Sequence, residues 1–209
     1  MLFRLNKTIV FPNPALADTD GLLAVGGDLS TERLVLAYSQ GIFPWYSDDE
    51  PILWYSPHER FVIFADEIHI SGSMQRLIRS DKYTVTWDND FRQVITHCAR
   101  IKREGQRGTW ITHDMIDAYI KLHDVGIAHS IEVWHEDKLI GGVYGVACGA
   151  VFCGESMFSL MPNASKLALI HICQSQHYKL IDCQLETAHL QSMGGRYISR
   201  TEYMAFLKP

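Results

Sequence analysis

Residues 128–158, AHSIEVWHEDKLIGGVYGVACGAVFCGESMF, decide the fold. Apolar and small residues fill three runs, HSIEVW (129–134), KLIGGVYGVA (138–147) and AVFCGESMF (150–158), and each run is long enough for a strand. The linkers around 135–138 and 148–149 leave room only for tight hairpins. The stretch therefore predicts a meander of three antiparallel strands.

The segments around the meander predict helices and two further strands. Helices are expected over 71–82, 89–101, 112–126, 163–178, 186–193 and 200–207, with Thr112 capping the third and a capping box of Ser199 and Glu202 starting the last. Strands are expected at YTVTW (83–87) and at KLIDCQ (179–184), which would lie beside the meander. This order predicts an α+β domain with a mostly antiparallel sheet over residues 63–209.

Residues 1–62 have a different composition. The stretches FPNPALADTDGLLAVGGDLS (11–30) and GIFPWYSDDEPILWYSPHERFVIF (41–64) are rich in proline, glycine, aspartate and aromatic residues, which is typical of turns with short extended pieces. A helix over 31–40 is expected between them, capped by Ser30 and ended by Gly41. We interpret residues 1–62 as a small irregular N-terminal domain.

Composition narrows the function classes. The chain has 209 residues, 47% hydrophobic and 21% charged, as in ordinary globular proteins. Its net charge of −5 argues against a generally basic nucleic-acid binder but leaves room for a local basic patch. Five cysteines without a C-x-x-C pair favour reduced thiols over a zinc site or a disulfide framework. We expect a cytoplasmic protein with no membrane span, no metal and no cofactor.

Two acidic residues and one amide occur in apolar strands. Asp182 and Gln184 are two residues apart in KLIDCQ, so regular alternation would place them on one face of the strand. A carboxylate in an apolar sheet is costly unless it is paired or hydrogen-bonded, so Asp182 is either a structural residue or a functional one that acts as a general base or an orienting acceptor. Glu155, in FCGESMF, raises the same question. Two acids with Gln184 as a relay would suit proton transfer at an amine or ester.

Tryptophans and basic residues offer a second set of candidates. Trp45 and Trp110 stand beside Gly, Pro and Thr in predicted loops, where they either complete the core or form platforms on which a nucleobase stacks. Arg76, Arg79 and Lys82 are spaced nearly as on one helix face, and a second basic group occupies residues 100–107. Such groups are either solvated surface or contacts for phosphate.

Eight motifs in one order resemble the bacterial leucyl/phenylalanyl-tRNA–protein transferase family, from about Phe11 to Leu207. They are GLLAVGGDLS (21–30), GIFPWYS (41–47), ILWYSP (52–57), GTWIT (108–112), AHSIEVW (128–134), GGVYGVACGAVFCGESMFS (141–159), NASK (163–166) and LIDCQ (180–184). The resemblance implies transfer of Leu, Phe or Met from aminoacyl-tRNA to the N-terminal Arg or Lys of a protein, which marks it for N-end rule degradation. It also implies an acetyltransferase-like (GNAT-like) second domain.

The resemblance also implies roles for individual residues. Asp182 would pull on Gln184, Gln184 would help take the proton from the acceptor α-amine, and Glu155 would hold the acceptor N-terminus or the donor amino group. Trp45 and Trp110 would sandwich the 3′ adenosine of the tRNA. The other implied positions are the tRNA contacts Arg76, Arg79 and Lys82 and the substrate-binding residues Tyr38, Val143, Phe152, Met157 and Leu169. The last four would form an apolar pocket for the donor side chain. By its shape, this pocket would accept Leu, Phe and Met and reject the β-branched Ile and Val.

Three other functions compete with this one. An acetyl-CoA-dependent acetyltransferase normally needs a glycine-bearing pyrophosphate loop, whereas MFSLMPNASKLAL (157–169) contains no glycine. A non-catalytic tRNA or N-degron binding module would be indifferent to Asp182→Asn. An aminoacyl-tRNA-dependent ligase of peptidoglycan cross-bridges would share the donor, but its lipid-linked acceptor does not suit a chain without a membrane-facing segment. A monomer is expected.

Overall fold

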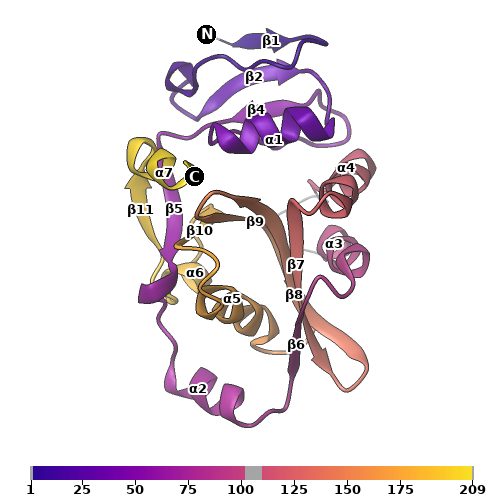
Figure 1. The fold of residues 1–209 in the computed structure, drawn as a ribbon, viewed down its shortest axis with the longest axis vertical. Helices are drawn as coiled ribbons and strands as arrows, with labels where there is room; N and C mark the ends of the chain where they lie inside the picture. The colour runs from indigo at the N-terminus through magenta and orange to yellow at the C-terminus, as the bar shows by residue number, and fades with distance from the viewer. Residues whose placement is uncertain (1, 102–109, 209) are drawn as a thin grey trace.

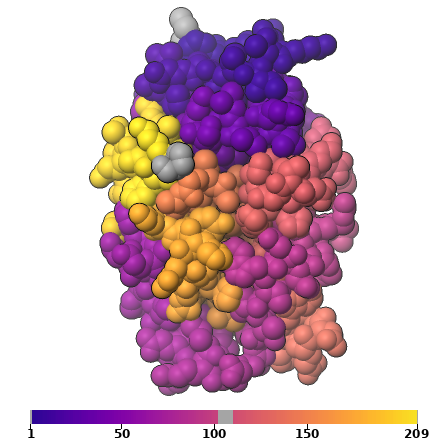
Figure 2. Space-filling model, viewed as in Figure 1, coloured from indigo at the N-terminus to yellow at the C-terminus, as the bar shows by residue number. Residues whose placement is uncertain are grey.

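The N-terminal part of the chain forms a small sheet. The computed structural model describes residues 2–101 and 110–208. Four strands pair in the order β1 (Phe3–Leu5), β2 (Leu22–Gly26), β4 (Leu53–Tyr55) and β3 (Phe43–Pro44). With α1 (Thr31–Ser39) and a 3-10 turn at Pro14–Leu16, this sheet sits at one end of the molecule (Figure 1). Figure 2 shows the same indigo and purple region packed against the rest of the chain.

A seven-stranded sheet forms the centre of the remainder. Its order is β11 (Arg196–Ser199), β5 (Glu59–Phe64), β10 (Leu180–Gln184), β9 (Val151–Ser159), β8 (Lys138–Cys148), β7 (Ala128–His135) and β6 (Thr84–Trp87). Neighbours are antiparallel except for β9 and β10, which are parallel. The predicted meander, the mostly antiparallel sheet and the place of KLIDCQ beside the meander are therefore confirmed. The expected domain division after residue 62 falls inside β5.

Helices cover both faces of this sheet and create two cores. α3 (Phe91–Arg100) and α4 (His113–Asp124) lie on one side of the meander and α5 (Ala164–Gln174) lies on the other (Figure 1). We call the cluster on the α3–α4 side, which also includes buried residues of the N-terminal sheet, the first core. The cluster beneath α5 is the second core. The remaining elements are α2 (Gly72–Arg79), α6 (Ala188–Gln191), α7 (Arg200–Phe206) and a 3-10 turn at Ala65–Glu67.

Local capping signals explain where several helices begin. The Thr112 hydroxyl oxygen accepts a hydrogen bond from the backbone N–H of Met115 at 3.2 Å, which starts α4. Ser199 and Glu202 form the predicted capping box at the start of α7. Among the described residues, none of the helices is long and apolar enough to cross a membrane.

Candidate active site

Asp182 lies in the middle of the seven-stranded sheet and is fully buried. In register it stands opposite Cys153 of β9 and Val62 of β5. One carboxylate oxygen, Oδ2, lies 3.0 Å from Nη2 of Arg60, whose side chain is almost as completely buried. The ion pair accounts for a charge in an apolar sheet, because a buried carboxylate is tolerated when a partner charge faces it.

Gln184 stands on a β-bulge at the end of β10. The pairing of β10 with β5 shifts between Asp182 and Gln184, so Cys183 is the extra residue and the expected regular alternation is interrupted. Gln184 has a left-handed backbone with φ of 59°. Its backbone N–H donates to Oδ1 of Asp182 at 2.9 Å. Its side-chain Nε2 instead donates to Oε1 of Glu155, also at 2.9 Å.

Glu155 stands on a second bulge, in the neighbouring strand β9. Tyr144 pairs with Ser156 and Gly145 pairs with Gly154, which leaves Glu155 as the extra residue. The bulge reverses the alternation of β9, since odd-numbered Cys153 before it and even-numbered Phe158 after it both belong to the first core. Two bulges in adjacent strands therefore bring the Glu155 carboxylate to the Gln184 amide.

Two tyrosines complete the surroundings of Glu155. The Tyr119 hydroxyl of α4 donates to Oε2 of Glu155 at 3.2 Å. The Tyr38 hydroxyl of α1 lies 2.5 Å from that of Tyr119. All three side chains are buried. The chain of hydrogen bonds connects a helix of the N-terminal part to the bulges of the large sheet.

The environment of Glu155 tunes its carboxyl group to neutral pH. Burial is the largest cause and, together with the nearby Asp182 carboxylate, raises the pKa of Glu155 to about 7, although hydrogen bonds from Tyr38, Tyr119 and Gln184 act to lower it. Burial and the Glu155 charge raise the pKa of Tyr38 and Tyr119 well above the usual tyrosine range, so both remain neutral donors. A carboxyl group with this pKa exchanges a proton at physiological pH, as a general base must.

The four residues expected to line the donor pocket are gathered on the other face of the sheet. They belong to the second core beneath α5 or pack against it, whereas the Glu155 network lies on the α4 side. Phe152 and Cys153, adjacent in β9, point into different cores. The residues concerned are Val143, Phe152, Met157 and Leu169.

The two candidate tryptophans lie outside the hydrogen-bonded network. Trp45 directly follows β3, is 38% exposed and has its ring 5.9 Å from that of Tyr55. Trp110 is partly buried against the first core. Gly108 and Thr109 of its motif lie outside the described residues. Stacking of adenosine between the two tryptophans stays a prediction.

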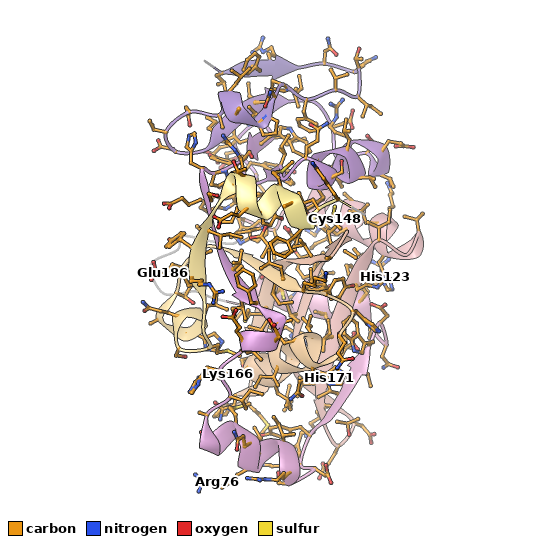
Figure 3. All side chains as sticks on the ribbon, turned by 60° about the vertical axis from the view of Figure 1, so that its left-hand side comes forward. Arg76, His123, Cys148, Lys166, His171 and Glu186 are labelled. Carbon is orange, nitrogen blue, oxygen red and sulfur yellow. The ribbon has the colours of Figure 1, made fainter. Side chains whose placement is uncertain are left out.

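The basic candidates of the sequence analysis are exposed. Arg76 and Arg79 lie on α2, and Arg76 projects from the end of the molecule farthest from the N-terminal sheet (Figures 1 and 3). Lys82 is exposed after the helix, with Nζ 5.2 Å from the centre of the Tyr83 ring. In the second basic group, Lys102, Arg103 and Arg107 lie outside the described residues.

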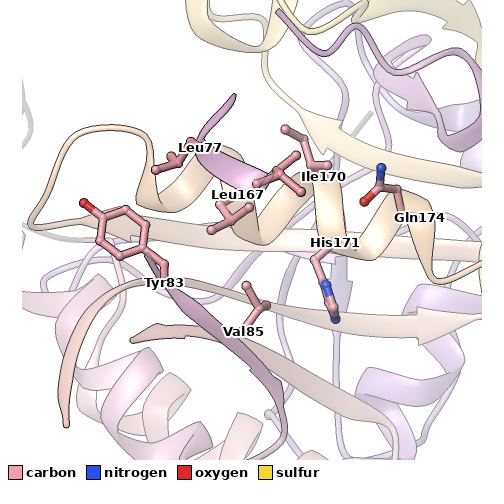
Figure 4. A pocket seen from close by; sticks show the side chains of 8 residues that line it. Leu77, Tyr83, Val85, Leu167, Ile170, His171 and Gln174 are labelled. Atoms are coloured by element: carbon pink, nitrogen blue, oxygen red, sulfur yellow. The ribbon is translucent and has the colours of Figure 1, made fainter. Parts of the chain in front are cut away.

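Two cavities near α2 were not anticipated. One of about 110 Å³ lies between α2, β6 and α5 and is lined mainly by apolar side chains with His171 and Gln174 at one end (Figure 4). The other, of about 240 Å³, is lined by residues that include His69 and Lys166. Glu155, Asp182 and Gln184 line neither, so the cavities and the hydrogen-bonded network are separate features.

Sequence reasoning also missed two members of the network. Tyr119 carries a polar hydroxyl but occurs in the apolar stripe of α4, where it counts as a core residue. Arg60 occurs in an apolar strand far from Asp182 in the sequence, and only the pairing of β5 with β10 brings the two together. The one feature of the sequence that could have pointed to Arg60 is its place directly before the apolar run FVIF (61–64), where a basic residue needs a partner.

Comparisons with known proteins identify the family. The model described as leucyl/phenylalanyl-tRNA protein transferase matches residues 62–208, and the model of that family's N-terminal domain matches residues 27–58. Proteins named leucyl/phenylalanyl-tRNA–protein transferase from Flavobacterium johnsoniae and Flavobacterium psychrophilum are 50% and 51% identical, with 99% and 98% of both chains covered. One from Syntrophobacter fumaroxidans is 53% identical over 99% of this chain and 89% of its own length. The chain belongs to the leucyl/phenylalanyl-tRNA–protein transferase family of aminoacyltransferases.

Proposed function

We propose that this chain transfers Leu, Phe or Met from aminoacyl-tRNA to the N-terminal Arg or Lys of acceptor proteins and so marks them for N-end rule degradation. The observation that carries the proposal is the contact between Gln184 and a buried Glu155 whose pKa is about 7, in a member of this family. That pair has the hydrogen-bonding capacity and the proton affinity that attack of an amine on an ester requires.

The contacts suggest how the pair acts. Nε2 of Gln184 is engaged by Glu155, which leaves the amide oxygen to accept a hydrogen bond from the acceptor α-amine. The amine nitrogen attacks the ester carbonyl carbon, the C–N bond forms, and the bond to the ribose 3′ oxygen breaks. The Gln184 amide oxygen takes the proton that the nitrogen loses while Nε2 passes a proton to Oε1 of Glu155, and the reverse relay returns a proton to the departing oxygen. Because the ester is already activated, positioning of the amine supplies a large part of the rate.

The remaining assignments belong to the same proposal. Residues 63–209 form a GNAT-like domain, which the meander followed by a long helix and a parallel strand supports, and residues 1–62 form a small N-terminal domain that shares the first core with it. The chain acts as a monomer. Trp45 and Trp110 bind the 3′ adenosine, while Val143, Phe152, Met157 and Leu169 bind the donor side chain.

A transfer assay tests the function. Purified protein is mixed with radiolabelled leucyl-tRNA and a peptide that starts with Arg, beside a matched peptide that starts with Ala. We expect label in the Arg peptide only. Bound tRNA without transfer would favour a binding module, and acetylation of the peptide in a parallel reaction with acetyl-CoA would favour an acetyltransferase.

Charge reversal on α2 tests the tRNA contact. Arg76→Glu with Arg79→Glu reverses two exposed positive charges, so affinity for tRNA should fall and the slope of log K against log salt should flatten by about 1.4 to 1.8. Fluorescence titration at several salt concentrations measures both. The control is Arg4→Glu, an exposed arginine in β1 at the other end of the molecule. An unchanged slope in the double variant would show that α2 does not touch phosphate.

Removal of the Tyr119 hydroxyl tests the tuning of Glu155. That hydroxyl bonds to Glu155 and acts to lower its pKa. Tyr119→Phe should therefore raise the pKa of Glu155 by about one unit, since a hydrogen bond to a charged group contributes about 1.5 kcal/mol. The acid side of the pH–rate profile should move to higher pH by the same amount. A shift to lower pH, or none, would contradict the hydrogen-bonded arrangement.

A further inference from the structure

Arg60 joins three parts of the chain at one buried point. It lies in β5 and is 2% exposed. Its guanidinium carbon lies over the rings of Phe43 from β3 and Tyr203 from α7, 4.7 Å and 4.6 Å from their centres. Nη2 faces Oδ2 of Asp182 at 3.0 Å. Both rings are close enough for cation–π contacts, which stabilise the buried guanidinium group beside Asp182.

The carboxylate held by Arg60 determines the backbone of the active-site bulge. Oδ1 of Asp182 accepts the backbone N–H of Gln184, two residues along the chain, as in an Asx-turn. Gln184 is not glycine and has φ of 59°, a conformation that a side chain disfavours and that a local hydrogen bond must stabilise. With this conformation, its amide reaches Glu155 at 2.9 Å.

We infer that Arg60 is a positioning residue for aminoacyl transfer, and that Asp182 acts through the backbone N–H of Gln184 and not as a base. The inference rests on the proposed function. Position 182 must supply an acceptor for the backbone N–H of Gln184. The negative charge of Asp182 is needed only because the positive charge of Arg60 faces it. A neutral pair that keeps the acceptor should then support transfer.

Five variants separate these contributions. Asp182→Asn keeps the acceptor but leaves the Arg60 charge unpaired, and Arg60→Met leaves the Asp182 charge unpaired. Each should lower kcat by about 10- to 100-fold, with KM for leucyl-tRNA within about threefold of the wild type. Arg60→Met with Asp182→Asn removes both charges and should recover kcat to within about threefold of the wild type. Arg60→Met with Asp182→Leu also removes both charges but lacks the acceptor, and should stay slow. The charge-conserving Arg60→Lys should be faster than Arg60→Met.

The experiment is single-turnover transfer to an Arg peptide, with melting temperatures and crystal structures of both double variants. A double variant with Asn that is as slow as Asp182→Asn would overturn the inference, because the carboxylate charge itself would then be required. Equal rates for the Asn and Leu double variants would also overturn it. A wild type without transfer would refute the proposed function instead, and φ of Gln184 in the two crystal structures would still report whether the acceptor holds the bulge.

Discussion

Glu155→Gln is expected to lower kcat/KM for aminoacyl transfer by about 100-fold, the lower range for loss of a general base. Gln has nearly the same shape as Glu and can still bond to Tyr119 and Gln184, but it cannot take a proton. The positioned amine and the activated ester remain, so residual transfer is expected. The fall should appear in kcat more than in KM for leucyl-tRNA, since Glu155 is buried behind Gln184.

Folding of this variant should not suffer above neutral pH. The pKa of Glu155 is raised in the folded protein. The free energy of unfolding therefore falls as the pH rises from the pKa of Glu155 in the unfolded chain to about 7, because the ionised carboxylate is less favourable in the folded state. A neutral side chain at that position avoids this cost. The control is Glu32→Gln, an exposed glutamate in the first turn of α1, which should transfer at the wild-type rate. A rate for Glu155→Gln within threefold of the wild type would remove Glu155 from the mechanism.

Gly145→Ala is expected to lower the free energy of unfolding by about 3 kcal/mol, the upper range for overpacking a core. Gly145 stands opposite Gly154 at the bulge that turns Glu155 towards Gln184. A Cβ there would lie 2.3 Å from the backbone oxygen of Cys153 and 2.7 Å from the Phe152 ring. A backbone oxygen in the middle of a sheet cannot move aside, so the bulge must distort. Transfer should fall further than stability alone explains.

Unfolding in denaturant measures the stability, and transfer at a temperature where both proteins are folded measures the second effect. Gly72→Ala is the matched control, because a Cβ at this exposed position of α2 meets nothing within 4 Å. Alanine there should leave transfer unchanged and raise stability by up to about 1 kcal/mol. A Gly145→Ala protein as stable as the wild type would mean that β8 and β9 are not paired as described.

The elements were predictable where one local pattern determines them. The short linkers between apolar runs indicated the meander, and the box of Ser199 and Glu202 marked the start of α7. The bulges were not predictable, because a single extra residue leaves a strand looking apolar and regular. The left-handed backbone of Gln184 carries no glycine or asparagine to signal it. Alternation alone therefore put Asp182 and Gln184 on one face.

The candidate site was predictable in its residue types but not in its pairings. Apolar surroundings singled out Asp182, Glu155 and Gln184, since carboxylates and amides in strands need partners. A carboxylate accepts from any donor, and the sequence does not say which one folding brings near. Arg60 lies in β5, the strand that pairs with the other edge of β10. Tyr119 lies in the apolar stripe of α4, where a core residue is equally expected.

The pH dependence of transfer, measured for the wild type and Glu155→Gln with the same Arg peptide, tests most directly whether Glu155 takes the proton. The α-amine of the peptide titrates near pH 8 in both reactions, so the ratio of the two rates cancels its effect. We predict that the rate of the wild type divided by that of Glu155→Gln rises about tenfold per pH unit below pH 7 and levels off above it, since the pKa of Glu155 is about 7. A ratio that stays constant from about pH 6 to pH 8.5 would contradict a Glu155 base.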